Sequence, residues 1–144
     1  MVFSGIYNHT IDSKGRLIIP AKFREGLGQT FYILQGFEGN IDVYPEAQWE
    51  EMAAKIQKLP RTSEKARKLS RIFIAGATDC QPDSQGRFLL PVIYRDFGNL
   101  KKDVVVTGVF DHLEIWDKER WDTYYSETSN DITMNPDEFA DLGI

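Results

Sequence analysis

Apolar residues alternate with polar ones in short runs along much of the chain, which is the period of a half-buried β-strand. Such runs cover residues 5–11, 16–19, 31–37, 40–44, 103–109 and 113–116. The turn-forming residues Asp, Ser and Gly separate the first two runs, so we predict that these two runs pair as one hairpin. The pattern predicts a mainly β chain with helices between the strand pairs.

Two prolines mark the starts of short helices. Pro20 and Pro91 suit a first helical turn, because proline lacks the N–H group that would have no partner there. The predicted helices run through Arg24 and Arg95, which occupy the same place after each proline. Because both arginines recur, a structural role such as pairing with the neighbouring acids is one interpretation.

The middle of the chain is predicted to hold two longer helices. The first begins at Pro45 and stops before Pro60, with one apolar stripe made by Trp49, Met52, Ala53, Ile56 and Leu59. Thr62 is the predicted N-cap of the second, whose buried side is formed by Ala66, Leu69, Ile72 and Phe73. After a further helix over 117–126, residues 128–144 show little periodicity, and we expect them to be mobile or loosely docked.

The chain repeats itself once. Residues 12–25 and 83–96 share six identities, and six more positions hold conservative exchanges. The register continues with one inserted residue, which aligns Trp49 with Trp121, while Phe23 aligns with Tyr94. Core packing explains these aromatic pairs better than base stacking. A module of about 45 residues buries too little surface to fold alone, so we expect two ββαββ modules to share one core as a pseudo-dimer.

The composition excludes several classes of protein. At 144 residues and 42% hydrophobic content, the chain is large enough for one core. It has no apolar run long enough for a membrane span and no signal-peptide pattern, so we expect a cytoplasmic protein without a membrane partner. Cys80 is the only cysteine, which excludes an intrachain disulfide, and we expect it to be a small buried residue.

Reactive groups are sparse. His9, expected in the first strand, and His112, expected in a β-turn, do not have the spacing of a catalytic or metal motif. No glycine-rich loop followed by Lys-Ser or Lys-Thr is present. We therefore expect no enzyme activity, no metal, no cofactor and no small-molecule substrate.

Charge is distributed unevenly along the chain. The net charge of −5 arises in residues 127–144, which hold five acids and no Lys or Arg, so residues 1–126 carry 17 charges of each sign. Residues 52–71 hold seven basic side chains and one acid, a local charge of +6. Such a run is most often a solvated helix face, and a binding surface is the alternative.

The repeats carry a recognisable set of residues, namely Gly5, Tyr7, His9-Thr10-Ile11-Asp12, Gly15-Arg16, Pro20-Ala21-Lys22-Phe23-Arg24 and Gly76-Ala77-Thr78. In these residues the chain resembles the MraZ family, bacterial transcriptional regulators built from two SpoVT-AbrB modules. The family's Asp-x-x-x-Arg signature occurs twice, as Asp12 with Arg16 and Asp83 with Arg87.

The resemblance implies an α+β, mainly β fold in which two ββαββ-type SpoVT-AbrB repeats form an intrachain pseudo-dimeric swapped-hairpin or split β-barrel with flanking helices. We place repeat 1 at 6–48, a basic helical linker at 49–76, repeat 2 at 77–120, and a C-terminal helix with an acidic tail at 121–144. The resemblance also implies a homo-oligomer, shaped as a ring, that binds repeated sites in double-stranded promoter DNA of its own division and cell-wall gene cluster. Such a protein is cytoplasmic and nucleoid-associated.

Arg16 is the leading candidate for contact with DNA, because its guanidinium fork can bind a guanine edge while Lys14 meets a phosphate. Arg87 is its counterpart in the second repeat, and Lys22 and Arg24 are candidates for phosphate contacts. The residues predicted to support the turns are Asp12, Gly15, Asp83 and Gly86. The alternative is that Asp12 and Arg16 only hold the hairpin together.

The second repeat replaces Lys14 by Gln85 and Lys22 by Ile93. We therefore predict that the first repeat binds DNA and that the second builds the assembly, with Ile93 packed against the first module or a neighbouring subunit. An alternative function is an antitoxin-like oligomeric protein-interaction module that uses its acidic tail, with DNA binding secondary.

Overall fold

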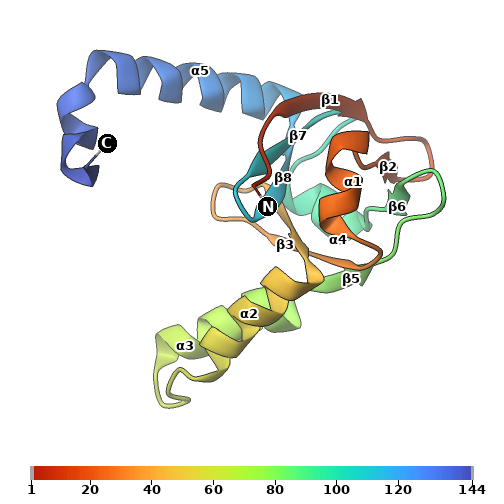
Figure 1. Cartoon of the computed structure of the whole chain (residues 1–144), viewed down its shortest axis with the longest axis horizontal. Helices are drawn as coiled ribbons and strands as arrows, with labels where there is room; N and C mark the ends of the chain where they lie inside the picture. The colour runs from red at the N-terminus through yellow and green to blue at the C-terminus, as the bar shows by residue number, and fades with distance from the viewer. Residues whose placement is uncertain (1, 144) are drawn as a thin grey trace.

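A six-stranded antiparallel sheet forms the centre of the protein in a computed structural model that describes residues 2–143 (Figure 1). Its strand order is β1-β7-β8-β4-β3-β5, and β2 and β6 form a separate two-stranded ribbon. The strands are β1 (Ile6–Thr10), β2 (Arg16–Ile18), β3 (Phe31–Gln35), β4 (Ile41–Pro45), β5 (Thr78–Cys80), β6 (Arg87–Leu89), β7 (Asp103–Val109) and β8 (His112–Asp117). Over the described residues β1 and β5 remain edge strands, so the sheet is not a closed barrel.

Helices flank this sheet. They are α1 (Ala21–Leu27), α2 (Glu46–Gln57), α3 (Glu64–Leu69), the π-helical turn η1 (Ser70–Ala75), α4 (Val92–Phe97), α5 (Lys118–Met134) and the 3-10 helix η2 (Pro136–Leu142). The predicted α+β, mainly β class with two similar halves is confirmed. His112 begins β8 and does not lie in the turn that precedes it, where we had placed it.

The first two strands do not pair with each other, so the predicted hairpin is wrong in its pairing. β1 pairs with β7, and β2 pairs with β6 of the other repeat. The turn between them still closes, because the Asp12 N–H group donates to the Arg16 carbonyl at 2.9 Å. The exchange is favoured because β2 brings Leu17 against Phe88, and both side chains are buried in the shared core.

The core takes side chains from both repeats. Phe23 and Tyr94, which align in the two repeats, are 1% and 4% exposed. Phe23 makes edge-to-face contacts with Phe3 and Tyr7. The Tyr94 hydroxyl lies 2.7 Å from the Gly76 carbonyl, which satisfies its buried polar end. Core packing is confirmed for this aromatic pair, and Cys80 is buried as expected.

The segment between the repeats forms a helical hairpin of α2 and α3 that projects from the body (Figure 1). Ser63 caps α3, not Thr62 as predicted, since the Ser63 hydroxyl accepts from the Ala66 N–H group at 3.2 Å. The predicted apolar stripe of α2 is only partly covered, because no residue of this helix is buried. Ile72, predicted to be buried, is 44% exposed.

The C-terminal helix is longer than the pattern predicted. α5 continues to Met134 and η2 follows it, so residues 128–142 are mostly helical. The first turns of α5 pack on the sheet through Trp121, whose ring lies edge-on to Trp116 at 5.4 Å between centroids. Further along, α5 extends away from the body (Figure 1). The Asp117 cap and the Lys118–Asp122 ion pair stabilise the N-terminal turns of α5, from which the rest of the helix continues.

Candidate nucleic-acid interface

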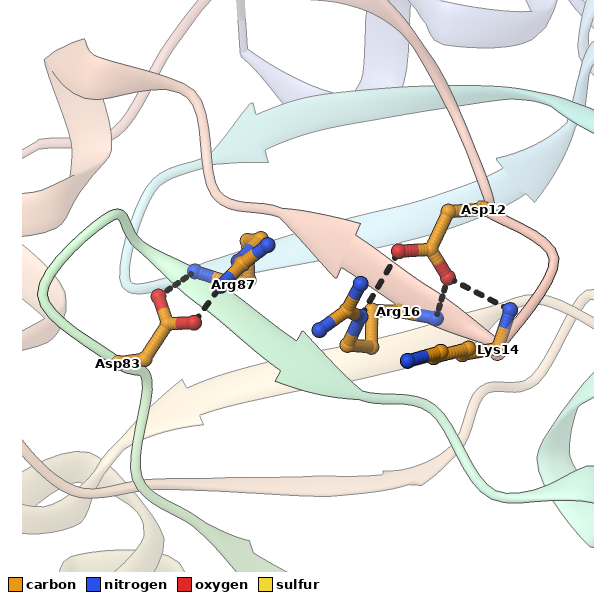
Figure 2. A network of polar contacts seen from close by, with 5 residues as sticks. All are labelled: Asp12, Lys14, Arg16, Asp83 and Arg87. Atoms are coloured by element: carbon orange, nitrogen blue, oxygen red, sulfur yellow. Dashed lines mark hydrogen bonds and ion pairs between the residues drawn. The ribbon is translucent and has the colours of Figure 1, made fainter.

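The turn before β2 is organised by one carboxylate. Asp12 Oδ1 accepts the N–H groups of Lys14 at 2.9 Å and Arg16 at 2.8 Å, and Asp12 Oδ2 accepts Arg16 Nε at 2.8 Å (Figure 2). The bond from the Arg16 N–H group is the largest of the effects that lower the pKa of Asp12. Gly15 completes the turn at φ +79°, a conformation that glycine adopts without steric cost.

The second repeat reproduces this turn. Asp83 Oδ1 accepts the N–H group of Gln85 at 2.9 Å. Figure 2 shows the two bonds from Arg87, whose N–H group donates to Asp83 Oδ1 at 2.9 Å and whose Nε donates to Asp83 Oδ2 at 2.8 Å. The pKa of Asp83 is lowered for the same reason, led by the bond from the Arg87 N–H group. Replacement of Lys14 by Gln85 leaves the geometry intact, because only the backbone of that residue contacts the carboxylate.

Each turn is held by the other repeat. The Ile19 N–H group donates to the Gly86 carbonyl, and the Leu90 N–H group donates to the Gly15 carbonyl, both at 2.9 Å. These reciprocal bonds extend the β2–β6 ladder into both turns. A change in the backbone of one turn therefore alters a hydrogen bond to the strand of the other repeat.

Arg24 and Arg95 are each anchored in their own repeat and reach the turn of the other repeat. Their Nε groups donate to the carbonyls of Ile19 and Leu90 at 2.9 Å, rather than to the acids that follow them in sequence. A Cβ atom at Gly86 would lie 2.5 Å from Arg24 Nε, and one at Gly15 would lie 2.9 Å from Arg95 Nη2. The expectation of pairing with Glu25 or Asp96 is therefore wrong, and each guanidinium lies against the turn of the opposite repeat.

Four side chains form one outward surface of the ribbon, which we call the ribbon face: Arg16, Ile18, Arg87 and Leu89. Arg16 is paired with Leu89 and Ile18 with Arg87, which places all four on the same side of the two strands. Leu17 and Phe88 point into the core from the opposite side. The side chains of Arg16 and Arg87 are 34% and 32% exposed, so the ribbon brings together the two signature arginines.

Ile18 and Leu89 were missed as site residues by sequence reasoning. They are 39% and 57% exposed in the ribbon face, although their apolar character suggested core positions. The alternation of Arg16, Leu17 and Ile18 was the available signal, since residues two apart in a strand share a face.

The remaining predicted basic residues are dispersed. Lys14 is exposed in the first turn. Lys22 Nζ donates to the Ser4 carbonyl at 3.3 Å, so its amine lies by the segment that precedes β1 and outside both turn networks. Ile93 is 70% exposed, which corrects the expectation that it packs on the first module and leaves a neighbouring subunit as the alternative.

One group among the described residues has the composition of a metal site. Donor atoms of Asp42, His112 and Glu114 lie within 4.8 Å of one another. Each already has a protein partner, since Asn40 donates to Asp42, Trp116 donates to Glu114, and the two His112 nitrogens lie against Asp111 and Glu114. No buried side-chain N or O in the described part of the chain lacks a hydrogen bond. We therefore assign an ion-paired network at this position.

The charges of this network follow from its contacts. Burial lowers the pKa of His112, but hydrogen bonds to Glu114 and Asp111 outweigh it and raise the pKa to about 9. Burial raises the pKa of Asp42 to about 6.

None of the helices over residues 2–143 has the length and apolar character needed to cross a membrane.

Comparison with known proteins agrees with the two-repeat organisation. The family model of the MraZ protein, described as antitoxin-like, matches twice, at residues 2–72 and 73–142. Transcriptional regulator MraZ of Moorella thermoacetica is 47% identical over 99% of this chain and 100% of the relative. The proteins of the same name from Natranaerobius thermophilus and Lachnoclostridium phytofermentans are 43% and 44% identical, over 99% and 96% of this chain and 100% and 98% of each relative. The chain therefore belongs to the MraZ family of transcriptional regulators, which are not enzymes.

Proposed function

We propose that this regulator binds duplex DNA in a sequence-specific manner through the ribbon face. The observation that carries the proposal is the placement of Arg16 and Arg87 on one exposed side of a two-stranded ribbon. A two-stranded β-ribbon has the width that the major groove admits. The face therefore has both the shape and the donors that base recognition requires.

The Asp–Arg pairs prepare both arginines for guanine. Each aspartate binds the Nε group of its arginine, and a guanidinium carries five N–H donors in a fixed fork. This bond uses only Nε, so the terminal nitrogens are available to the O6 and N7 acceptors of guanine. Because Asp12 and Asp83 hold the forks before DNA arrives, less side-chain freedom is lost on binding.

The other members of the site take supporting roles in this proposal. Ile18 and Leu89 are placed for apolar contact with thymine methyl groups, and Lys14 for a phosphate beside the first turn. Lys22 and Arg24 contribute at most to phosphate binding, since each already donates to a backbone carbonyl. Asp12, Gly15, Asp83 and Gly86 shape the two turns.

The equivalence of the two turns changes our hypothesis about the repeats. The sequence suggested that repeat 1 binds DNA and that repeat 2 chiefly builds the assembly, because repeat 2 has Gln85 and Ile93 where repeat 1 has Lys14 and Lys22. The shared ribbon face favours joint use of Arg16 and Arg87. Repeat 1 then differs by its extra phosphate contact at Lys14.

A single ribbon face offers few base contacts, so useful affinity requires several faces on one assembly that bind repeated sites. We propose a ring-shaped homo-oligomer acting at the promoter of its own division and cell-wall gene cluster, with nucleoid association as the consequence. The resemblance in the signature residues supports this part, and the relatives named transcriptional regulator MraZ support a role in transcription.

The test is fluorescence anisotropy with DNA from upstream of the gene, at several salt concentrations. Arg16→Ala and Arg87→Ala should each weaken binding by about 1 to 3 kcal/mol, roughly 5- to 150-fold, as loss of a bidentate base contact requires. Lys14→Ala should lower the log–log salt slope by about 0.9. Lys55→Ala, which removes one exposed charge from the projecting α2–α3 hairpin, is the matched control and should change little. Equal affinity of all folded variants would refute the ribbon face as the DNA site.

The alternative of an antitoxin-like interaction module is favoured by one observation, the acidic C-terminal segment that extends from the body (Figure 1). Deletion of residues 128–144 separates the two functions. A DNA-binding regulator should keep or gain affinity for an isolated site, because the deletion removes four of the five acids of residues 127–144 and so reduces repulsion of the phosphates. A module whose main partner is another protein would lose that partner and show little salt-dependent DNA binding.

A further inference from the structure

The α2–α3 hairpin contains an unfilled apolar groove. Its floor is formed by Ala53, Ile56, Leu59, Pro60, Ile74 and Ala75, and its volume is about 650 Å³. None of the α2 residues is buried, and Leu59 is 40% exposed. We call this feature the helical groove. Arg61, Arg67 and Arg71 also line it, within the segment of residues 52–71 that carries a charge of +6.

The C-terminal segment has the opposite character. In this segment, which we call the arm and define as residues 125–142, the second half of α5 and η2 extend from the body (Figure 1). Its exposed apolar side chains include Tyr125, Ile132, Met134 and Leu142. It also carries all five acids of residues 127–144 and no basic side chain.

The arm lacks the packing that would keep it helical by itself. Isolated helices shorter than about 12 to 15 residues are marginal in water, and most helices in proteins depend on a buried apolar face. Tyr125 and Ile132 are seven residues apart and lie on one side of α5, and they are 52% and 49% exposed. A partner that covers this side would stabilise the helix.

We propose that the arm of one copy of this chain docks in the helical groove of the next copy. Apolar side chains of the arm fill the floor, and its acids face the arginines at the rim. This inference rests on the proposed oligomer and identifies the contact that builds it.

Charge selects this arrangement over its alternatives. Two arms brought together would each contribute the negative charge of residues 127–144, and two grooves would each contribute +6. Both symmetric pairings therefore repel, whereas an arm in a groove joins opposite charges. A basic groove that served only DNA would not need an apolar floor.

The geometry also favours contact between copies over contact within one. The arm and the α2–α3 hairpin project in different directions from the body (Figure 1). A contact between two different surfaces of identical chains is heterologous, and its repetition closes into a ring or continues as a filament. The ribbon face belongs to neither surface, so assembly leaves it free for DNA.

A charge exchange tests the contact directly. We would reverse the arm with Asp131→Lys, Asp137→Lys and Asp141→Lys, and reverse the groove with Arg61→Glu, Arg67→Glu and Arg71→Glu. Sedimentation velocity of the full chain should show the assembly dissociate to monomer in either variant alone. Combining both sets in one chain places three lysines on the arm opposite three glutamates at the groove rim, which restores opposite charges at these positions and should restore the assembly. Matched reversals outside the groove, Lys55→Glu and Lys68→Glu, should leave its mass unchanged, because both residues pair within their own helices.

The outcomes that overturn the proposal are distinct. Unchanged mass in both single reversals would exclude the contact, and dissociation without recovery in the combined variant would exclude direct pairing of these charges. A groove reversal that loses DNA affinity at unchanged mass would assign the groove to DNA. Circular dichroism establishes that each variant is folded.

A second measurement does not depend on charge. Ile132→Cys in one copy and Ala53→Cys in another, carrying different tags, should form a disulfide between copies under mild oxidation, while Lys55→Cys should not pair with Ile132→Cys. Absence of the first cross-link in an assembled sample would contradict the docking. Arg16→Ala should leave the assembled mass unchanged, so failure of the DNA proposal and failure of this contact are separate results.

Discussion

At the scale of single residues, the two Asp-x-x-x-Arg signatures are alike in every polar contact of the carboxylate. Asp12 and Asp83 each accept two backbone N–H groups and one arginine Nε group. Exposed ion pairs of this kind contribute little to stability, so their value lies in holding the guanidinium in place. Identical geometry in both repeats indicates that the signature is a structural unit independent of its neighbours Lys14 and Gln85.

The turn glycines permit a controlled prediction. Gly15→Ala places a Cβ atom 2.9 Å from Arg95 Nη2 at φ +79°, whereas Gly143→Ala, at φ +79° and ψ +20°, has no atom within 4 Å. Both substitutions should cost about 1 to 2 kcal/mol for the left-handed conformation. Urea denaturation should show a larger loss for Gly15→Ala, which must also displace the guanidinium from the other repeat. Equal losses would mean that Arg95 moves aside freely.

His112 predicts a pH dependence. Its pKa rises from 6.5 to about 9 on folding, so the folded state binds the proton more tightly than the unfolded state. The stabilisation is full below about pH 6.5 and is lost as the pH rises through 9. Between pH 6.5 and 8.5 the free energy of unfolding should therefore fall, and this slope should be smaller in His112→Gln.

The comparison of slopes isolates the histidine. Cys80, whose pKa burial raises to about 12, also reduces stability at high pH, but it is common to both proteins. The same slope in wild type and His112→Gln would show that the network with Glu114 and Asp111 does not favour the charged ring.

At the scale of elements, the β2–β6 ribbon is short, because each strand has only three residues. Its stability comes from Leu17 and Phe88 beneath it and from the reciprocal bonds at both ends. One side of the ribbon therefore belongs to the core, and the other is free to carry the ribbon face. Of the six residues of the ribbon, two therefore serve the core and four form the surface proposed to bind DNA.

Substitution of the apolar members of the ribbon face tests that separation. Ile18→Ser with Leu89→Ser should change the free energy of unfolding by less than about 1 kcal/mol in total, because both side chains are exposed. Binding to sites that contain thymine next to guanine should weaken, and preference for thymine over uracil at those positions should disappear. Competition anisotropy with uracil-substituted DNA measures the methyl contribution. A preference that survives would place the methyl contact elsewhere.

At the scale of the whole molecule, the chain presents three separate surfaces: the ribbon face, the helical groove and the arm. The groove and the arm lie on elements that project from the body, while the ribbon lies beside the shared core (Figure 1). Because the residues of the ribbon face belong neither to the arm nor to the groove, assembly and DNA binding can be altered independently by substitution.

Multivalent binding gives a prediction at this scale. Wild-type protein should bind DNA with three sites spaced by one helical turn at least about 100-fold more tightly than DNA with one site. The monomeric groove-reversal variant should show no such gain. Insertion of about half a turn between sites should reduce the wild-type gain, since adjacent faces would then meet opposite sides of the duplex. An equal gain in the monomer would contradict multivalency as its source.

The sequence by itself determined the local features of the protein. Repetition of residues 12–25 at 83–96 predicted two equivalent turns, and Asp, Gly and Arg at fixed spacing predicted their chemistry. Strands β3, β4, β7 and β8 followed from alternation, and Phe23 and Tyr94 from their matched positions. These features depend on interactions between residues close in sequence, so a local pattern contains them.

Only the tertiary structure decided which strands pair and what the pairing brings together. Alternation tells which side of a strand is buried but does not name its partner, so β1 and β2 were assigned to each other although each pairs with the second repeat. The contact of Arg24 and Arg95 with the turn of the opposite repeat and the joining of Arg16 with Arg87 on one face follow from that exchange. The physical reason is that strand pairing is selected by burial of apolar surface across the whole core, which short-range patterns do not record.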